Sequence, residues 1–178
     1  MKQEHLEYLK ELHTGAVAHE RGSLFDHLIG TYNYLASWGC EEHICSAGLF
    51  HSIYGTNIFR HATITHAKRQ QIKDLLGEKA EDLVYLFSCI NRPLGLITAI
   101  YDGYLLDATQ KSRILITREK LGELIEIEAA NLMEQGTGRL FFEKLLREVT
   151  ERNFPMREAI VPAIRKGASL NSTAISQG

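Results

Sequence analysis

Two histidines at the edges of apolar helical stretches are the residues of this sequence best placed to do chemistry. His27 lies beside the apolar residues of one predicted helix, and His51 ends the next predicted helix. Antiparallel packing of these helices would bring the two imidazoles together. Imidazole is a common ligand of divalent transition metals and a general acid or base near neutral pH. The alternative for either ring is a structural hydrogen bond to a backbone carbonyl.

Polar residues just after the second histidine offer a site that needs no metal. Ser52, Tyr54 and Thr56 end the apolar stretch and could hydrogen-bond a small molecule. They could equally satisfy the carbonyl groups at the end of their own helix. Arg21 and Arg60 flank this region and are candidates for binding an anionic group, because a guanidinium matches a carboxylate or phosphate.

Helical periodicity dominates the pattern that must position these residues. Ser23 is a predicted N-cap of one amphipathic helix, and Thr117 is the predicted N-cap of a longer one. Between Leu94 and Ile116 the helical pattern weakens, and a turn signal before Ile114–Ile116 allows one small β-hairpin. The expected helices cover about 2–13, 24–38, 41–51, 67–77, 79–90, 118–136, 138–152 and 156–166. The sequence therefore predicts an all-α bundle.

Length and composition indicate one domain. The chain has 178 residues, of which 44% are hydrophobic and 24% charged, so it can bury a core without staples. We expect a helical domain over 1–167 and a flexible tail over 168–178, where small and polar residues predominate. The net charge of -2 is unlike that of a protein with a broad basic surface, so nucleic acid is not an expected partner.

The remaining composition bears on location and association. Three cysteines without a CxxC pair and the absence of a leader pattern at the N-terminus favour a cytoplasmic protein with reduced thiols. The sequence has no apolar run long enough to cross a membrane, so no membrane association is expected. The apolar stripe at 140–149 is either core or a face for a homodimer.

Two motifs around the histidines resemble a known superfamily. His27, followed one helix later by "AGLFHS", resembles the histidine and the later "AALLHD" of the HD-domain superfamily of metal-dependent phosphohydrolases. The likeness is greatest to the hydrolase half of the bifunctional alarmone synthetases, and "IKDLLGEKAEDLVYLF" resembles the helix pair that follows the motif there. The stretch "GLFHSIYGT" is also similar to a signature of bacterial and plant proteins of unknown function. The superfamily resemblance implies an HD-like helical bundle with a metal site at His27 and His51.

The sequence departs from this pattern at the carboxylates. Ser52 stands in place of the aspartate that follows the second histidine, and "LIEIEAANLMEQ" places Asn131 where "LADRLHNM" carries the final aspartate. Gly55 and Thr56 stand where the alarmone hydrolases have an acidic pair. A hydroxyl or an amide oxygen is a weaker metal ligand than a carboxylate. Alarmone hydrolysis by that family's mechanism is therefore not expected.

Additional histidines could compensate for the missing carboxylates. Some HD-type oxygenases hold iron with histidines located between the His-Asp pair and the last aspartate, and His61 and His66 lie in this interval. Together with His27 and His51 they would supply up to four nitrogen ligands for iron, manganese or zinc. By themselves, histidines in so polar a stretch are equally typical of an exposed loop.

Three functions follow from these alternatives. The first is a divergent HD-like enzyme that acts on a small anionic metabolite at His27, His51, Ser52 and Asn131, with or without one divalent transition metal. The second is a catalytically silent module on the same fold that binds a nucleotide or another small molecule. The third is an iron-dependent oxygenase of HD type. We expect the first, because a purely structural interpretation gives the two core histidines no shared role.

Overall fold

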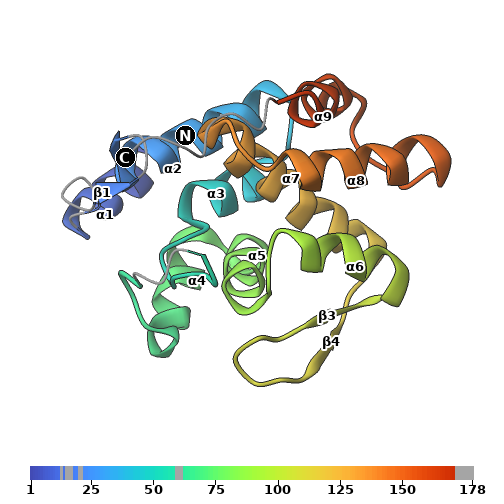
Figure 1. Cartoon of the computed structure of the whole chain (residues 1–178). Helices are drawn as coiled ribbons and strands as arrows, with labels where there is room; N and C mark the ends of the chain where they lie inside the picture. The colour runs from blue at the N-terminus through green and yellow to red at the C-terminus, as the bar shows by residue number, and fades with distance from the viewer. Residues whose placement is uncertain (13, 15–17, 20–21, 59–61, 171–178) are drawn as a thin grey trace.

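The computed structural model describes residues 1–12, 14, 18–19, 22–58 and 62–170, with the backbone alone described at 18, 19 and 22. The fold is all-α with small antiparallel strand pairs (Figure 1). Its first half comprises α1 (Gln3–Glu11), β1 (Ala18–His19), β2 (Gly22–Ser23), α2 (Leu24–Ser37), α3 (Glu42–Phe50), η2 (His66–Lys68), α4 (Arg69–Leu76) and α5 (Glu78–Cys89). Its second half comprises α6 (Leu94–Asp102), β3 (Tyr104–Leu106), β4 (Arg113–Leu115), α7 (Arg118–Gln135), α8 (Arg139–Glu151), η3 (Glu158–Ile160) and α9 (Val161–Ala168).

Helix α7 is the element on which the others are assembled. It packs against α2, α3, α5, α6 and α9. In Figure 1, α8 and α9 lie along the top of the molecule and the β3–β4 hairpin extends at the bottom. One apolar core reaches from Leu9 in α1 to Ile164 in α9. Within the described part of the chain, none of the helices has the length and apolar character needed to span a bilayer.

Side-chain caps explain where the two helices that carry most of the site begin. The hydroxyl of Ser23 accepts a hydrogen bond from the backbone N–H of Asp26 at 3.2 Å. Thr117 accepts one from the N–H of Lys120, also at 3.2 Å. Each bond satisfies an amide that lacks a partner in the first turn of a helix. These caps confirm the predicted starts of α2 and α7.

A close approach between α2 and α3 depends on Gly48. A Cβ atom built on Gly48 would lie 2.2 Å from Cδ1 of Leu35, much closer than carbon atoms pack. The missing side chain at Gly48 leaves room for the Leu35 side chain to pack directly on α3. The contact fixes the distance between the backbones that carry the two histidines.

Helix α6 was not predicted. Its sequence includes a glycine and several β-branched residues, which are poor helix formers. Leu96, Ile97 and Ala99 are nevertheless buried, and the helix packs against α7 and α8. Packing rather than intrinsic propensity therefore stabilises it, and it ends at Gly103, whose φ is 71°.

The predicted hairpin is confirmed as β3 and β4, and its loop is organised by one carboxylate. Leu105 pairs with Ile114 in the antiparallel register. Oδ1 of Asp107 accepts hydrogen bonds from the backbone N–H groups of Thr109 and Gln110, at 2.7 and 2.9 Å. Burial alone would raise the pKa of the Asp107 carboxyl, but these bonds and the Thr109 hydroxyl outweigh it and lower the pKa below 3.8.

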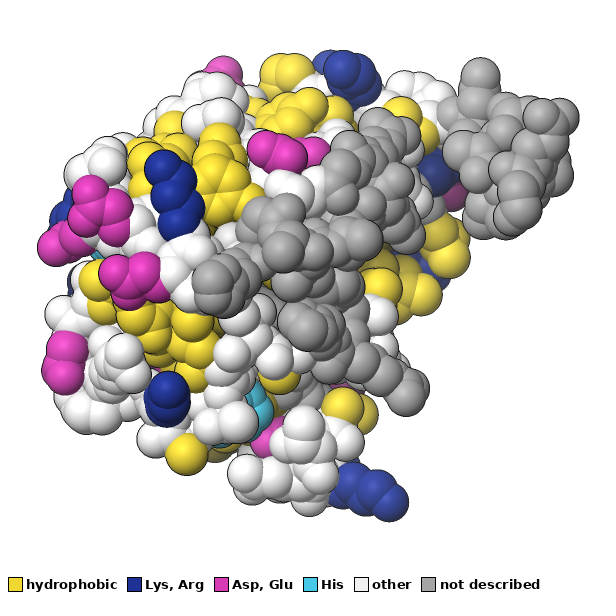
Figure 2. Space-filling model, turned by 90° about the vertical axis from the view of Figure 1, so that its left-hand side faces the viewer, with side chains coloured by type: hydrophobic (Ala, Val, Ile, Leu, Met, Phe, Trp, Pro, Cys, Tyr) yellow, Lys and Arg dark blue, Asp and Glu magenta, His cyan; other side chains and the backbone are white. Residues whose placement is uncertain are grey.

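Charged side chains of both signs are mixed on the surface that faces the viewer in Figure 2. On the described part of this face, single lysine and arginine side chains are scattered among acidic and apolar ones, and no broad basic surface is present there.

We predict that Asp107→Asn lowers the free energy of unfolding by about 1 kcal/mol at neutral pH, because the loop loses a charged acceptor of hydrogen bonds. The lowered pKa means that the carboxylate stabilises the fold fully above about pH 4 and loses this effect as the pH falls through its folded value. The wild type and the variant should therefore converge in stability toward pH 2 in urea unfolding. A difference that stays constant with pH would contradict the prediction.

Candidate functional site

The two core histidines meet inside the bundle. Nε2 of His27 lies 3.3 Å from Nε2 of His51, and the ring centroids are 5.1 Å apart. Both side chains are buried, with 3% and 2% of their surface exposed. His27 is carried by α2, and His51 follows the last turn of α3, so the close packing of these helices produces the contact. The structure thus brings together the pair that the sequence singled out.

The outer nitrogen of each ring is held by an acceptor. Nδ1 of His27 donates to the carboxylate of Glu134 on α7, and Nδ1 of His51 donates to the carbonyl of Gly48 at 2.7 Å. Glu134 reaches His27 across Gly30, where an added Cβ would lie 2.6 Å from Cγ of the glutamate. A carboxylate or a carbonyl on Nδ1 orients an imidazole and leaves Nε2 for chemistry.

In this orientation the Nε2 atoms of the two rings point at the same place between them. A neutral imidazole that donates through Nδ1 has a lone pair on Nε2. Two neutral rings would therefore point lone pairs at each other across 3.3 Å. The contact becomes attractive when a proton lies between the nitrogens, with the negative charge of Glu134 beside the ring that carries it.

Helix α7 contributes a polar stripe to this region. Glu128, Asn131 and Glu134 recur at every third residue of the helix and so lie along one side of it. Glu128 and Asn131 are fully buried. Oδ1 of Asn131 and Oγ of Ser52 are also buried, and neither has a hydrogen-bond partner among the described residues. Asn131 was a predicted site residue, whereas Glu128 and Glu134 were missed, although their spacing on an apolar helix was a readable signal.

A buried arginine that the sequence did not single out joins the same polar interior. Arg92 follows α5 and donates through Nη1 to Glu128 and through Nη2 to Oγ1 of Thr56, the latter at 3.3 Å. Its guanidinium lies 4.4 Å from the centre of the Phe87 ring, and the imidazole of His51 contacts that ring at 5.3 Å. Thr56, a predicted binding residue, is therefore connected to these buried polar groups by its hydrogen bond from Arg92.

Other predicted residues lie elsewhere or are not described. The hydroxyl of Tyr54 donates to Glu81 at 3.0 Å, and burial together with the charge of Glu81 raises its pKa, so it remains a donor. His66 contacts Ser88 through Nε2 at 3.1 Å, and its ring packs on Tyr54. These contacts place His66 apart from the histidine pair. Three further predicted residues lie outside the described part of the chain: Arg21, Arg60 and His61.

The donor atoms around the pair can be compared with the needs of a metal ion. Two nitrogens on a tetrahedral zinc ion are separated by about 3.3 to 3.4 Å when each bond is about 2.0 to 2.1 Å. The Nε2 atoms lie 3.3 Å apart, and the buried oxygens of Ser52 and Asn131 lack partners in the described part. Among the described residues, no three or more His, Cys, Asp or Glu are grouped to hold a metal. The spacing of the two Nε2 atoms thus equals that of two nitrogen ligands on one zinc ion, while a full set of His, Cys, Asp and Glu ligands is absent from the described residues.

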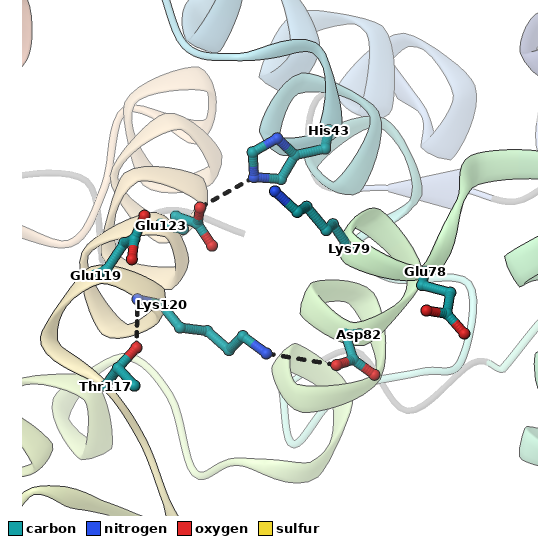
Figure 3. A pocket seen from close by; sticks show the side chains of 8 residues that line it. All are labelled: His43, Glu78, Lys79, Asp82, Thr117, Glu119, Lys120 and Glu123. Atoms are coloured by element: carbon teal, nitrogen blue, oxygen red, sulfur yellow. Dashed lines mark hydrogen bonds and ion pairs between the residues drawn. The ribbon is translucent and has the colours of Figure 1, made fainter.

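A separate pocket opens between the first turns of α3, α5 and α7 (Figure 3). It has a volume of about 280 Å³ and is lined by polar side chains, among which four carboxylates outnumber two lysines. His43 pairs with Glu123 at 2.9 Å, and Lys120 pairs with Asp82 at 3.4 Å. Acidic residues in the first turn of a helix also stabilise the helix itself. Two of the four carboxylates of this pocket are thus paired within it, with His43 and Lys120.

Comparison with known proteins gives one match to a family model, over less than half of the chain, and no activity. Residues 8–92 match the model of a family described as a domain of unknown function (DUF6817). This span includes both histidines, Ser52 and Arg92, and it ends before α7 begins. No curated protein and no solved structure matches the chain.

We predict that Glu134→Ala frees the His27 ring to change its tautomer, because Nδ1 loses its acceptor. Glu134→Gln keeps an oxygen acceptor without the charge. It should retain the tautomer but stabilise a proton between the two rings less than glutamate does. Nitrogen-15 NMR of the imidazoles measures both effects, and unfolding experiments should show a loss of about 1 to 3 kcal/mol for the alanine variant. Unchanged imidazole signals in both variants would show that Glu134 does not orient the pair.

Proposed function

We propose that this chain is a divergent HD-domain-like enzyme that acts on a small metabolite through the His27–His51 pair. The proposal is carried by one observation: the two Nε2 atoms face each other at 3.3 Å while each Nδ1 is held as a donor. An imidazole pair satisfied for structural reasons alone would need only one ring nitrogen facing an acceptor. Here the second nitrogens face each other, a contact that a proton or another cation between them would make favourable.

The pair is suited to acid and base catalysis. One imidazole can release the shared proton to a substrate while the other accepts a proton, and Glu134 stabilises the positive charge on His27. A carboxylate that orients a histidine and stabilises its protonated form is a recurring catalytic arrangement. Ser52 and Asn131 supply unpartnered oxygens that can position the substrate.

A transition metal is compatible with the same proposal. Iron, manganese or zinc would be held by Nε2 of His27 and of His51, with the oxygens of Ser52 and Asn131 as further ligands. When bound, such an ion supplies Lewis acidity and lowers the pKa of a coordinated water. With or without the metal, Glu134 and the carbonyl of Gly48 orient the two rings so that both Nε2 atoms point at the same place.

Location and binding partner complete the proposal. The cysteines are free thiols, which supports the cytoplasm, where thiols stay reduced. The expected partner is a small molecule, because the polar groups of the site are few and buried.

A silent binding module is the second candidate. It is favoured by the neutral Ser52 and Asn131 at the positions where the superfamily has carboxylates, and by the absence of a grouped set of His, Cys, Asp and Glu ligands in the described residues. Such a module would bind the same metabolite at the same position without converting it.

The proposed function is tested by purifying the chain, measuring its metal content and screening a metabolite panel for thermal stabilisation and turnover. We predict that His51→Ala lowers turnover of any converted compound by about 100-fold or more, the usual range for loss of a general acid or base. His43→Ala, which removes a histidine of the pocket in Figure 3, is the matched control and should retain activity.

Three outcomes separate the candidates. Turnover that needs His51 but not His43 supports the enzyme. Stabilisation by a compound that is never converted, and that is lost in His51→Ala, supports the silent module. Metal content, stabilisation and turnover that are the same in wild type and His51→Ala would refute both.

A further inference from the structure

Strand β4 forms an open edge of the β3–β4 hairpin, which extends at the bottom of the molecule in Figure 1. Strand β3 packs against α6 as well as β4, whereas the main contact of β4 is with β3. Within the described part of the chain, this sheet has two strands. A sheet edge with unpaired backbone groups is a template for another strand.

The register of the hairpin shows which backbone groups of β4 are used. At its two ends, the N–H of Ile116 donates to the carbonyl of Gly103, and the N–H of Asp107 donates to the carbonyl of Ser112. Hydrogen-bonded positions recur at every second residue of an antiparallel strand. Ile114, midway between the two ends, therefore directs its N–H and C=O toward β3. The residues on either side of it direct theirs the other way.

Arg113 and Leu115 thus present their N–H and C=O groups to the open edge. No backbone hydrogen bond of the described chain uses these groups. The two side chains share the outer face of the hairpin with Leu106, the cross-strand partner of Arg113. Leu115 is 87% exposed, the most of any described large hydrophobic side chain, and Leu106 is 56% exposed. A strand added here would gain backbone hydrogen bonds and an apolar contact.

The charges along this edge select the kind of strand. Lys111 and Arg113 are exposed, and neither forms an ion pair with a described residue. The guanidinium of Arg113 lies 4.6 Å from the centre of the Tyr104 ring. A second copy of the chain would bring two basic edges together, and like charges across strands are destabilising. The edge therefore favours a strand that carries a carboxylate.

We propose that β4 is a docking edge for an extended acidic segment of another protein, which adds antiparallel to Arg113–Leu115. An apolar residue of the segment lies beside Leu115, and a carboxylate lies beside Arg113. Because the strands run in opposite directions, the segment reads apolar residue, any residue, acidic residue from its N-terminus. This docking edge does not involve the histidine pair, so it is independent of the proposed function.

The first test follows the backbone amides of β4 by nitrogen-15 NMR during titration with the peptide acetyl-Thr-Val-Thr-Glu-Thr-amide. We expect saturable shifts and slower hydrogen exchange at Arg113 and Leu115, with smaller changes at Ile114, whose N–H already faces β3. A peptide with lysine in place of glutamate should bind at least about fivefold more weakly, because opposite charges across strands attract and like charges repel. Equal binding of the two peptides, or unchanged Arg113 and Leu115 amides, overturns the proposal.

N-methylated peptides test the backbone pairing itself. A methyl group on the valine nitrogen removes the N–H that would face Leu115, and it should abolish the shifts. A methyl group on the central threonine nitrogen, which would point away from β4, is the matched control and should preserve them. Equal binding of both methylated peptides would show that no strand is added.

A charge reversal tests the pairing with the carboxylate. Arg113→Glu should bind the lysine peptide at least about fivefold more tightly than the glutamate peptide. Lys10→Glu makes the same change of charge type at an exposed position of α1 and should keep the wild-type preference. A preference for glutamate that persists in Arg113→Glu refutes the assigned contact. Protection of the Arg113 and Leu115 amides that rises with protein concentration, without any peptide, would assign the edge to a second copy and overturn the proposal.

Discussion

The hydrogen bond on the outer nitrogen of each histidine is the constraint on which the site depends. Nδ1–H of His51 donates to the carbonyl of Gly48, and Nδ1–H of His27 donates to the carboxylate of Glu134. These hydrogen bonds fix both rings with Nε2 pointing inward. The short distance between α2 and α3 then leaves the two Nε2 atoms in contact. Side-chain chemistry at the centre of the bundle is therefore decided by backbone packing and by a carboxylate from α7.

Buried charge is balanced locally around this contact. Glu128 is matched by Arg92, and Glu134 lies beside a ring that can carry a proton. An unmatched charge in an apolar interior would be strongly destabilising, so each carboxylate of the α7 stripe requires its partner. Glu134, one helical turn after Asn131, reaches the outer nitrogen of His27 and orients the ring.

Local features of the fold were predictable because they depend on neighbouring residues. The caps at Ser23 and Thr117 act within one turn, and the apolar periodicity of the flanking helices indicated which sides face the core. The pairing of His27 with His51 was also predictable, since one helix follows the other directly. In contrast, α6 has low intrinsic helical propensity and is stabilised by contacts with distant segments, which periodicity does not report.

The partners of the site were harder to predict because they depend on long-range geometry. Glu134 lies 107 positions from His27, and Arg92 is 36 positions from Glu128. In a sequence, an arginine beside a proline or a glutamate near the end of a helix is most simply a solvated residue. Only the path of the chain after α5 buries Arg92, and only the packing of α7 against α2 directs Glu134, which is 20% exposed, toward His27.

Gly30 and Gly48 give the bundle a limit on how it can be engineered. Replacing a helical glycine with alanine is a standard way to raise thermostability, since it reduces the freedom of the unfolded chain. At these two positions the added methyl group would collide with Glu134 or Leu35. An alanine there would have to displace one of these side chains, and at Gly30 the displaced side chain is the glutamate that orients His27.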